Sequence, residues 1–511
     1  MRPLLLMVLG CAAPLAAAAI CAEADAITRN LAAPARTVDI RKDCGAKGDG
    51  VSNDTTAFQK AAARLQAAGG GRLVIPRGVY VVGEQGHEAG RYPYYQAKPV
   101  FRLDGVAGLR IEGQQGAVIR LAGGLHYGSF DRDTGEPYDP KAANTYKDGL
   151  FVDARYAAYP GNLIEVRGST NVVIRDLELD GSSGRLVLGG LYGDTGRQLP
   201  ASGLSLYNNA RVLVERVHTH DHGLDGIIIG CSGLKAADAP TPHVLVDVVS
   251  EYNARQGLSW VGGKGLTAVG CRFNHTGKRA FQSAPGAGVD IEAEDSVCRD
   301  GVFRQCEFVN NAGCGVVADS GDGGYTRFEN CTFWGTTGWA LWNHKPGMVF
   351  EACRFYGSIV HAYGSTNAPA LATRYTRCRF EDKPHPEFGV ARFGLLVAHD
   401  GNADGVRFEQ CEFVAHEVKS VWLAGSALLD GCSFTHANAQ VANGDFQALF
   451  RGCELRNCRL SEAFPGGCTN RYYVLAQNVR VGVNVTVQGP LVRWENWSSG
   501  PTGLLSRVPA P

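Results

Sequence analysis

Carboxylate side chains recur at matching positions in a run of similar segments in the middle of the chain. Each segment begins with a turn glycine and continues with a short apolar run: Gly203–Tyr207, Gly226–Gly230, Gly257–Val261, Gly288–Glu292, Gly315–Asp319 and Gly338–Asn343. If the first residue after each glycine points into the core, alternate residues project outward from one sheet. The outward set is then Ser205, Tyr207, Ser259, Asp290, Glu292 and Asp319. This face is the predicted substrate groove.

The expected spacing of these carboxylates suits acid and base chemistry. Asp290 and Glu292, two residues apart on one strand, should lie roughly 6.6 Å apart, and Glu292 and Asp319 on adjacent coils roughly 4.8 Å apart. Carboxylates this close cannot both ionise without cost, so one pKa rises or a cation binds between them. Glycosidases use carboxyl pairs about 5 to 9.5 Å apart, which allows hydrolysis here with retention or inversion.

The turn that enters this sheet adds other polar groups. It carries His218, His220, Asp221, His222 and Asp225 on one coil and Arg255 and Gln256 on the next. Arg255 could hold a uronate carboxylate with two parallel hydrogen bonds. Lysis or epimerisation of a uronate needs such a donor, together with a base and a proton source. The predicted catalytic residues are Asp225, Arg255, Asp290, Glu292 and Asp319, and the predicted substrate-binding residues are His220, His222, Gln256, Ser259, Lys264, Asn343 and His361.

Each of these groups also has a structural interpretation. Asp225 could cap backbone groups in a turn. The three histidines between His218 and His222 could form a metal site or a solvated surface, so the metal ligands stay undetermined. Ca²⁺ is a candidate cofactor of the acidic cluster. The Glu292 and Asp319 pair favours function, because like charges on adjacent strands are destabilising unless a ligand or reaction uses them.

The elements that must position these residues are visible in the cysteine pattern. Eight of the 16 cysteines begin a Cys-x-aromatic or Cys-x-Leu triplet: Cys271, Cys306, Cys331, Cys353, Cys378, Cys411, Cys432 and Cys453. Most intervals between them are 21 to 25 residues, which suits one coil of a parallel β-helix. The longer intervals indicate loop insertions. We interpret the eight as an internal ladder of buried, unreactive thiols, because neither disulfides nor metal sites require such a periodic column.

Other segments agree with an all-β solenoid. Val172–Leu179 and Val212–Val217 are short β-rich runs bounded by Asn and Gly turns. One helix is predicted near residues 53–68, with Asn53 or Asp54 as its cap and an apolar stripe from Ala57 to Leu65. The sequence therefore predicts a right-handed parallel β-helix whose open first coil is covered by this short helix.

The opening of the chain resembles a known family. Asp43–Asp54, the helix, and then Gly69–Tyr80 are similar to the N-terminal signature of the pectate-lyase superfamily, which includes rhamnogalacturonase-like and alginate-epimerase-like proteins. The resemblance implies a right-handed β-helix and, usually, action on polysaccharide. The paired Asp, Gly-His-Gly and Arg-Ile-Lys motifs of polygalacturonases and the Asp-Pro-His-Glu motif of alginate epimerases are absent. Gly223–Gly226 and Asn253–Gly257 are similar to segments around the epimerase site.

Composition and the chain ends restrict the possible partners and cellular location of the protein. Fifty basic and fifty acidic residues give no net charge, which argues against a nucleic-acid or anionic-membrane partner. Residues 1–26 resemble a cleavable signal peptide, and Cys11 leaves a lipoprotein signal as an alternative. We therefore expect an exported, monomeric protein without a transmembrane segment, with residues 27–511 as one domain.

Residues 86–160 hold eight of the 18 tyrosines and are predicted to form a loop insertion that lines the groove or packs over the first coils.

Three functions fit these features. The favoured one is a lyase or C5-epimerase that acts on a uronate-containing polysaccharide. The alternatives are a glycoside hydrolase of the polygalacturonase or rhamnogalacturonase type that uses the carboxyl pair, and a glycan-binding β-helix protein without catalysis. The tail beyond Asn478, where valines alternate from Val479 to Val487, is expected to close the last coil.

Overall fold

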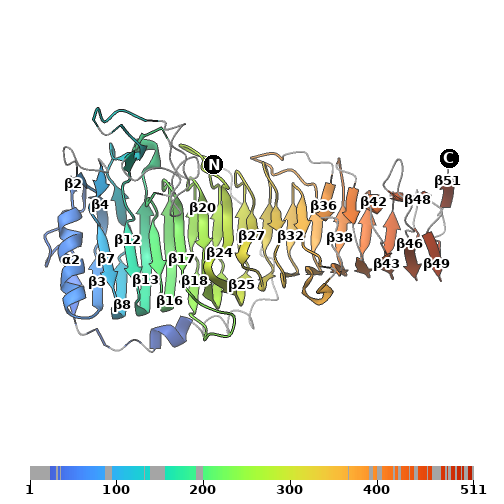
Figure 1. Cartoon of the computed structure of the whole chain (residues 1–511), viewed down its shortest axis with the longest axis horizontal. Coiled ribbons are helices and arrows are strands. Elements are labelled where there is room, and N and C mark those ends of the chain that lie inside the picture. Colours follow the sequence, from blue (N-terminus) through green and yellow to red (C-terminus); the bar gives the residue numbers. More distant parts are fainter. Residues whose placement is uncertain are drawn as a thin grey trace, which may run out of the picture.

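The chain winds into one elongated β-helix, in which sequence order follows position along the long axis (Figure 1). This computed structural model describes residues 24–508 except 30, 32, 35, 87–94, 132, 139–155, 191–198, 366, 391–394, 400–404, 418–419, 424–426, 437, 442–446, 457–458, 463–472, 478–479, 482–484, 489–491, 496–497 and 500–504. Most of the predicted signal peptide, and parts of the Tyr-rich segment and of the valine-rich tail, lie outside the described residues. Among those described, no helix has the length and apolar character that a membrane span requires.

The described strands form two long parallel sheets, called here the smaller and the larger sheet. The smaller sheet contains β7 (Phe101–Asp104), β12 (Ile164–Arg167), β15 (Leu204–Tyr207), β17 (Asp225–Gly230), β20 (Gln256–Trp260), β21 (Gly263–Lys264), β24 (Ala287–Arg299), β27 (Val316–Asp322), β30 (Leu341–Asn343), β33 (Val360–Ala362), β36 (Leu395–His399), β39 (Ser420–Leu423), β42 (Asn438–Val441), β45 (Arg459–Glu462), β48 (Val485–Gln488) and β51 (Leu505–Val508). Each strand pairs in parallel with the strand one coil away.

The larger sheet takes two strands from most coils. It contains β1 (Thr37–Asp39), β2 (Asp49–Asn53), β3 (Gly71–Ile75), β4 (Gly78–Val82), β8 (Ala107–Gly113), β9 (Ala117–Leu121), β13 (Thr170–Asp180), β16 (Ala210–His220), β18 (His243–Val246), β19 (Val249–Glu251), β22 (Leu266–Val269), β23 (Arg272–Asn274), β25 (Gly301–Arg304), β26 (Glu307–Val309), β28 (Thr326–Glu329), β29 (Thr332–Trp334), β31 (Val349–Glu351), β32 (Arg354–Tyr356), β34 (Arg374–Thr376), β35 (Arg379–Glu381), β37 (Arg407–Glu409), β38 (Glu412–Val414), β40 (Leu428–Asp430), β41 (Ser433–Thr435), β43 (Gln447–Arg451), β44 (Glu454–Arg456), β46 (Tyr473–Gln477), β47 (Arg480–Val481), β49 (Val492–Glu495) and β50 (Ser498–Ser499). The predicted right-handed parallel β-helix is therefore confirmed.

Smaller elements decorate the first half of the solenoid. They are β5 (Gln85–Gly86) with β6 (Gln96–Ala97), a sheet of β10 (His126–Ser129), β11 (Ala157–Ala158) and β14 (Val187–Leu188), and the 3₁₀ helices Ser183–Arg185 and Pro369–Leu371. Residues 24–29 form a helical turn on the outside. There Ile27 and Leu31 pack against Val173, Leu213 and Val244 of the larger sheet.

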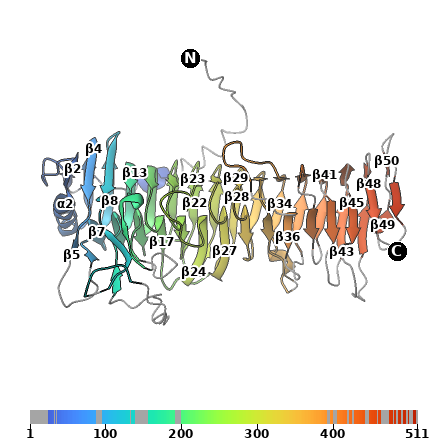
Figure 2. The ribbon, with the colours of Figure 1, turned by 90° about the horizontal axis from the view of Figure 1, so that it is seen from above.

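Helix α2 (Thr55–Ala67) covers the first coil, as predicted (Figures 1 and 2). Its buried stripe includes Phe58 and Leu65, which join the main core. Asp54 does not cap the helix through its side chain. Its carboxylate instead accepts hydrogen bonds from the backbone N–H groups of Lys47 and Gly48, at 2.6 and 2.9 Å. The aspartate that ends the N-terminal signature thus fixes the turn before the helix.

The cysteine ladder is present and buried, but it lies at a corner and not within a strand. The thiols stand between the two larger-sheet strands of each coil, and each follows a residue with positive φ, such as Gln305 before Cys306. Cys306 donates to the carbonyls of Ala268 and Arg304, at 3.5 and 3.3 Å. All eight are free thiols with at most 1% of their surface exposed. Burial raises the pKa of the Cys306 thiol, which keeps it protonated and unreactive.

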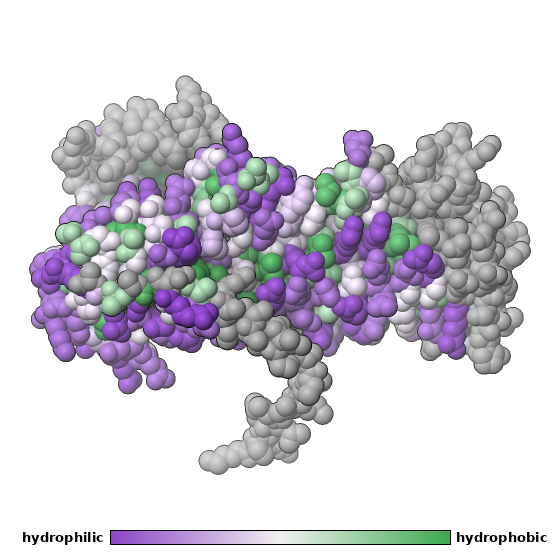
Figure 3. Space-filling view, turned by 90° about the horizontal axis from the view of Figure 1, so that it is seen from below, coloured by the Kyte–Doolittle hydropathy of each residue, from purple (hydrophilic) through white to green (hydrophobic). Residues whose placement is uncertain are grey.

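Aromatic rings fill the core beside the ladder in two stacks. The first follows the Cys-x-Phe triplets, with rings such as Phe308, Phe333 and Phe355 stacked at 4.6 to 4.7 Å. The second, which includes Phe303 and Phe328 at 4.9 Å, comes from the strands before the corner. Outside this core the strands carry polar residues, and Figure 3 shows hydrophilic side chains over much of the described surface on one side.

Candidate functional site

The outer face of the smaller sheet carries a continuous row of aligned side chains. The register pairs Ser205 with Ile228, Ile228 with Ser259, and Ser259 with Asp290. It continues from Asp290 through Val317 to Trp342. The residues before them, such as Leu258 and Val289, are fully buried in the core. Ser259 and Asp290 of the row are themselves buried, at 1% and 7% exposed, so the row is aligned as predicted but does not form an open surface.

Asp225, Arg255 and Ser259 form a compact hydrogen-bonded group at the start of strands β17 and β20. Arg255 donates from Nε and Nη2 to the two Asp225 carboxylate oxygens, at 2.8 and 2.6 Å. The Ser259 hydroxyl donates to Asp225 Oδ2 at 3.0 Å. Asp225 is fully buried and Arg255 is 5% exposed. The predicted uronate-binding role of Arg255 is therefore not supported, because its guanidinium already makes the expected bidentate contact with Asp225.

Asp290 adjoins this group through Gln256. Gln256 Nε2 donates to Asp290 Oδ2 at 2.7 Å, and its Oε1 accepts from the backbone N–H of Ala287 at 3.0 Å. These two hydrogen bonds fix the amide of Gln256 against the Asp290 carboxyl, which is 7% exposed. Burial, and then the nearby Glu292 carboxylate, raise the pKa of Asp290 well above its usual range, with Asp319 and Asp225 adding to the effect. Asp290 is therefore protonated under conditions in which an ordinary aspartate is ionised.

The expected pairing of Glu292 with Asp319 is wrong. The register shifts between β24 and β27, so Glu292 pairs with Ser320, although Asp290 pairs with Val317 as in regular strands. The extra residue in β27 moves Asp319 out of the row opposite Glu292. Asp319 is exposed and accepts a hydrogen bond from the Ser320 hydroxyl at 3.0 Å. Both carboxylates nevertheless lie close enough to Asp290 to raise its pKa.

Glu294, which the sequence analysis did not select, extends the acidic group along β24. It follows Glu292 by two residues, and burial together with Glu292 raises the pKa of its carboxyl. The same alternation that selected Asp290 and Glu292 would have found it. The acidic group of this face is defined here as Asp290, Glu292, Glu294 and Asp319.

Tyr207 flanks the acidic group on the side toward the N-terminus. A Cβ atom on Gly230 would come within 2.5 Å of Tyr207 Cε1, so the ring lies directly over this glycine of the next coil. Burial raises the pKa of the Tyr207 hydroxyl, and the Glu294 and Asp225 carboxylates raise it further. The ring of Tyr207 therefore forms a half-buried wall of the site, and its hydroxyl remains protonated.

An aromatic group continues the same face on the other side. Trp342 contacts Trp339 at 4.5 Å between ring centroids and His361 at 4.9 Å, and His344 stacks on His361 at 4.1 Å. Trp339, Trp342 and His344 are half-exposed. Rings of this kind offer apolar faces with polar edges, which suit sugar rings. The sequence analysis selected only Asn343 and His361 here, although Trp342 occupies the outward position of its segment.

Other predicted binding residues are placed elsewhere or turned inward. Asn343 is buried and donates to Thr373 Oγ1 at 2.9 Å. Lys264 is 8% exposed, and its ammonium donates to the carbonyls of Ala236 and Asp238. His222 is buried and hydrogen-bonded to Thr219, and burial lowers its pKa to about 3. These three residues stabilise coils and do not line the face, which corrects the prediction for each of them.

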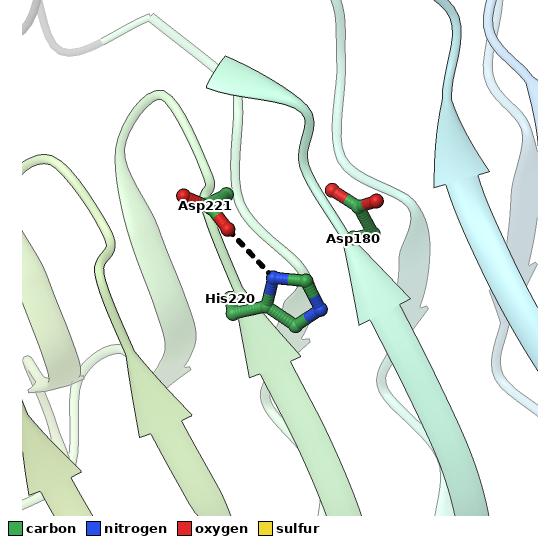
Figure 4. A group of neighbouring side chains, drawn as sticks. All are labelled: Asp180, His220 and Asp221. Atoms are coloured by element: carbon green, nitrogen blue, oxygen red, sulfur yellow. Dashed lines mark hydrogen bonds and ion pairs between the residues drawn. The ribbon is translucent and has the colours of Figure 1, made fainter. Parts of the chain in front are cut away.

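His220 lies on the larger sheet, away from the acidic group. It belongs to the one close group of at least three potential metal ligands among the described residues: Asp180, His220 and Asp221 (Figure 4). His220 Nδ1 is 2.8 Å from Asp221 Oδ2. Asp180 and Asp221 already pair with Arg120 and Arg279, at 2.7 and 2.5 Å. A cation bound here would therefore have to compete with two guanidinium groups.

Comparison with known proteins agrees with the fold. Residues 162–355 match a family model described as a right-handed beta helix region. A search of curated protein sequences finds no relative of the chain. The N-terminal fragment of the bacteriophage Phi29 gene product 12 has a similar structure, with 16% identity, a TM-score of 0.51, and coverage of 91% of this chain and 71% of that chain.

Two other solved structures are more distant in shape. The Azotobacter vinelandii mannuronan C-5 epimerase AlgE6 A-module has 15% identity, a TM-score of 0.40, and coverage of 91% of this chain and 99% of its own. The tailspike protein gp49 of Acinetobacter baumannii bacteriophage Fri1, a capsular polysaccharide depolymerase, has 12% identity, a TM-score of 0.41, and coverage of 91% and 64%. These comparisons show the fold alone, a right-handed parallel β-helix.

Proposed function

We propose that the chain is a polysaccharide-active glycoside hydrolase whose active site is the acidic group around Asp290. The observation that carries this proposal is that Asp290 is buried close to the Glu292 and Asp319 carboxylates, which together with burial raise its pKa. Hydrolysis of a glycosidic bond needs one protonated acid and one ionised carboxylate. Environments that drive the pKa values of neighbouring carboxyls apart produce this division of roles.

Asp290 is assigned as the general acid that protonates the leaving oxygen. Gln256 positions its carboxyl, and the Asp225, Arg255 and Ser259 group supports the adjacent coil. Glu292 or Asp319 is assigned as the partner carboxylate that activates water or attacks the sugar directly. The rings of Trp342 and Tyr207 lie on either side of the acids and would stack on neighbouring sugar units.

Hydrolysis is favoured over the lyase or C5-epimerase reaction that the sequence analysis preferred. Abstraction of the C5 proton requires a donor that neutralises the substrate carboxylate. Arg255 was the predicted donor, and its bidentate contact with Asp225 occupies the guanidinium face. The resemblance of the N-terminal signature to the pectate-lyase superfamily and the stacking surface support a glycan substrate. The signal peptide predicted at residues 1–26 would bring the protein to this substrate outside the cytoplasm.

A product assay separates the three functions. The full chain is incubated with polygalacturonate, rhamnogalacturonan and mannuronan, and new reducing ends, ultraviolet absorbance of unsaturated uronates, and NMR signals of epimerised units are recorded. Hydrolysis predicts reducing ends without absorbance, and loss of these ends in Asp290→Asn. Glu307→Gln, an exposed carboxylate on the larger sheet, is the matched control and should retain activity. Unsaturated or epimerised products, or binding without any product, would overturn the proposal.

A further inference from the structure

A cavity opens on the smaller sheet, on coils nearer the N-terminus than the acidic group. Its volume is about 200 Å³. It is lined by Ala97, Pro99, Val100, Phe101, Arg102, Tyr159, Gly161, Asn162, Glu165, Arg167 and Pro200. Arg102, Glu165 and Arg167 belong to strands β7 and β12, so the cavity faces the same side of the sheet as Asp290. Its size suits part of one sugar unit.

Two arginines give this cavity its charge. Arg102 donates to Asp104 at 2.9 Å and also lies 3.8 Å from Glu165. Arg167 Nε pairs with Glu165 at 2.5 Å, and among the described residues Glu165 is its sole ion-pair partner. The Arg167 side chain is 45% exposed, and its terminal Nη groups remain as donors for a ligand. A guanidinium with free Nη groups is suited to a carboxylate.

The uncharged walls suit the rest of a sugar ring. Tyr159, from the Tyr-rich insertion, is half-exposed and lines the cavity together with Pro200. Asn162 Oδ1 accepts a hydrogen bond from the Ser202 backbone N–H at 3.0 Å, which orients its amide group. An aromatic ring, a fixed amide and a guanidinium are the groups that would recognise a uronate.

The sheet register sets the distance from this cavity to the proposed acid. The row runs from Glu165 through Ser205, Ile228 and Ser259 to Asp290, which makes four steps between coils. At about 4.8 Å per step the separation is roughly 19 Å. An extended glycan advances by about one coil spacing per sugar unit, so a chain along this face covers roughly five units. Tyr207, paired with Arg167 in the register, lies between the two positions.

We propose that this cavity is a distal subsite that binds a carboxylate-bearing sugar unit of the glycan, with Arg167 as the anion-binding group. The inference rests on the proposed function, and it adds that the substrate is an acidic polymer bound along the solenoid axis. It also implies cleavage within a chain of at least about five units. Arg167 here is a binding residue and takes no part in bond cleavage.

Binding of oligouronates of defined length tests the subsite without relying on turnover. Calorimetry on the full chain compares the trimer and the heptamer of galacturonate, and likewise of mannuronate. We expect at least one heptamer to bind about 10-fold more tightly than its trimer, and Arg167→Ala to remove this gain while leaving trimer binding unchanged. Arg167→Lys, which keeps the charge and loses the planar fork, should retain part of the gain. Arg327→Ala on the larger sheet is the matched control and should retain all of it.

The outcomes separate the subsite from the proposed reaction. A length-dependent gain that needs Arg167, in a protein that produces no reducing ends, would support the subsite and overturn hydrolysis. Hydrolysis with a gain that Arg167→Ala leaves intact would overturn the subsite alone. No gain with either polymer, or equal loss of trimer and heptamer binding in Arg167→Ala, would also overturn it. Methyl-esterified heptamer, which lacks the charge, should show no dependence on Arg167.

Discussion

Two acidic clusters lie on different sheets of this solenoid, and they differ in how their charge is balanced. On the larger sheet, Asp180 pairs with Arg120, Asp221 pairs with Arg279 and His220, and Glu251 pairs with His218. On the smaller sheet, no described lysine or arginine forms an ion pair with Asp290, Glu292 or Asp319. The first cluster is neutralised internally, and the second keeps its mutual repulsion.

The pKa shifts record this difference. Although burial acts to raise the pKa of Asp180, hydrogen bonds from Arg120 and from the Ser182 backbone hold it below the ordinary value. Burial and Glu292 instead raise the pKa of Asp290. A carboxylate held ionised by partners stabilises the fold, whereas a carboxyl kept protonated beside other acids stores a proton that a reaction can use. The comparison of the two clusters therefore shows that charge balance, more than the number of acids, distinguishes carboxylates that stabilise the fold from those able to take part in a reaction.

Exchange of one carboxylate for an amide in each cluster gives the largest predicted contrast. Asp290→Asn should reduce hydrolysis by about 100-fold or more, because the amide cannot donate the proton, while Gln256 retains an acceptor. Asp180→Asn should leave hydrolysis within about twofold and lower the free energy of unfolding by about 1–2 kcal/mol, because Arg120 loses a charged partner. Reducing-end assays and urea unfolding measure both effects. Equal loss of activity in the two variants would abolish the distinction between the clusters.

The pH dependence should have opposite signs for the two carboxyls. The raised pKa of Asp290 means that the folded protein binds its proton more tightly than the unfolded chain, so this contribution to stability is lost as pH rises through the folded pKa. The lowered pKa of Asp180 makes a contribution that is lost as pH falls through the folded pKa. Hydrolysis should fall on the alkaline side, where Asp290 loses its proton. Unfolding curves of wild type, Asp290→Asn and Asp180→Asn across pH measure these differences, and parallel curves would contradict the assignment.

The sequence was sufficient to predict the architecture because the repeat is carried by residues that must be buried. The cysteine column and its following aromatics fixed the coil length, and the apolar stripe of α2 fixed the cap. Alternation within strands then placed Ser259 and Asp290 in one outward row. These inferences depend on periodicity alone, and periodicity is a local property of the chain.

The details of the site depended on contacts that periodicity does not encode. The extra residue in β27 displaced Asp319 from Glu292, and no residue type in that segment marks the bulge. Arg255 pairs with Asp225 because it directly precedes β20, beside the first residue of β17, a relation visible only when the coils are stacked. His220 was assigned to the wrong sheet, because a residue near a turn can belong to either adjoining strand. Lys264 was expected on the groove face, but its ammonium turns to the carbonyls of Ala236 and Asp238. Register and side-chain partners therefore needed the structure.

Removal of a ring from each sheet tests the proposed sugar-stacking surface. Trp342→Ala should weaken binding of the polymer substrate by about 3- to 10-fold, because the half-exposed indole next to the acidic group is lost. Trp334→Ala removes a half-exposed indole from β29 on the larger sheet and should leave glycan binding unchanged. Affinity electrophoresis in gels containing the polymer measures both. If Trp334→Ala weakens binding as much as Trp342→Ala, the binding face is not confined to the smaller sheet.

The smallest predicted effect comes from displacing a ring without deleting it. Gly230 has no positive φ, so Ala fits its backbone, but the added Cβ would meet Tyr207 Cε1 at 2.5 Å and Val261 Cγ2 at 3.1 Å. The tyrosine ring must move, and we expect KM to rise about 2- to 5-fold with kcat unchanged. Gly86→Ala, where a Cβ meets no atom within 4 Å, is the matched control and should change neither constant.

Tyr207→Phe separates the ring from its hydroxyl in this test. The hydroxyl of Tyr207 remains protonated because of burial, so its removal should leave kcat unchanged if the residue acts only as a wall. A large fall in kcat with unchanged KM would instead make the hydroxyl a participant in proton transfer. That result would assign proton transfer on the smaller sheet to Tyr207 as well as to the carboxyl pair. The difference from the neutralised cluster on the larger sheet would then depend on Tyr207 as well as on Asp290.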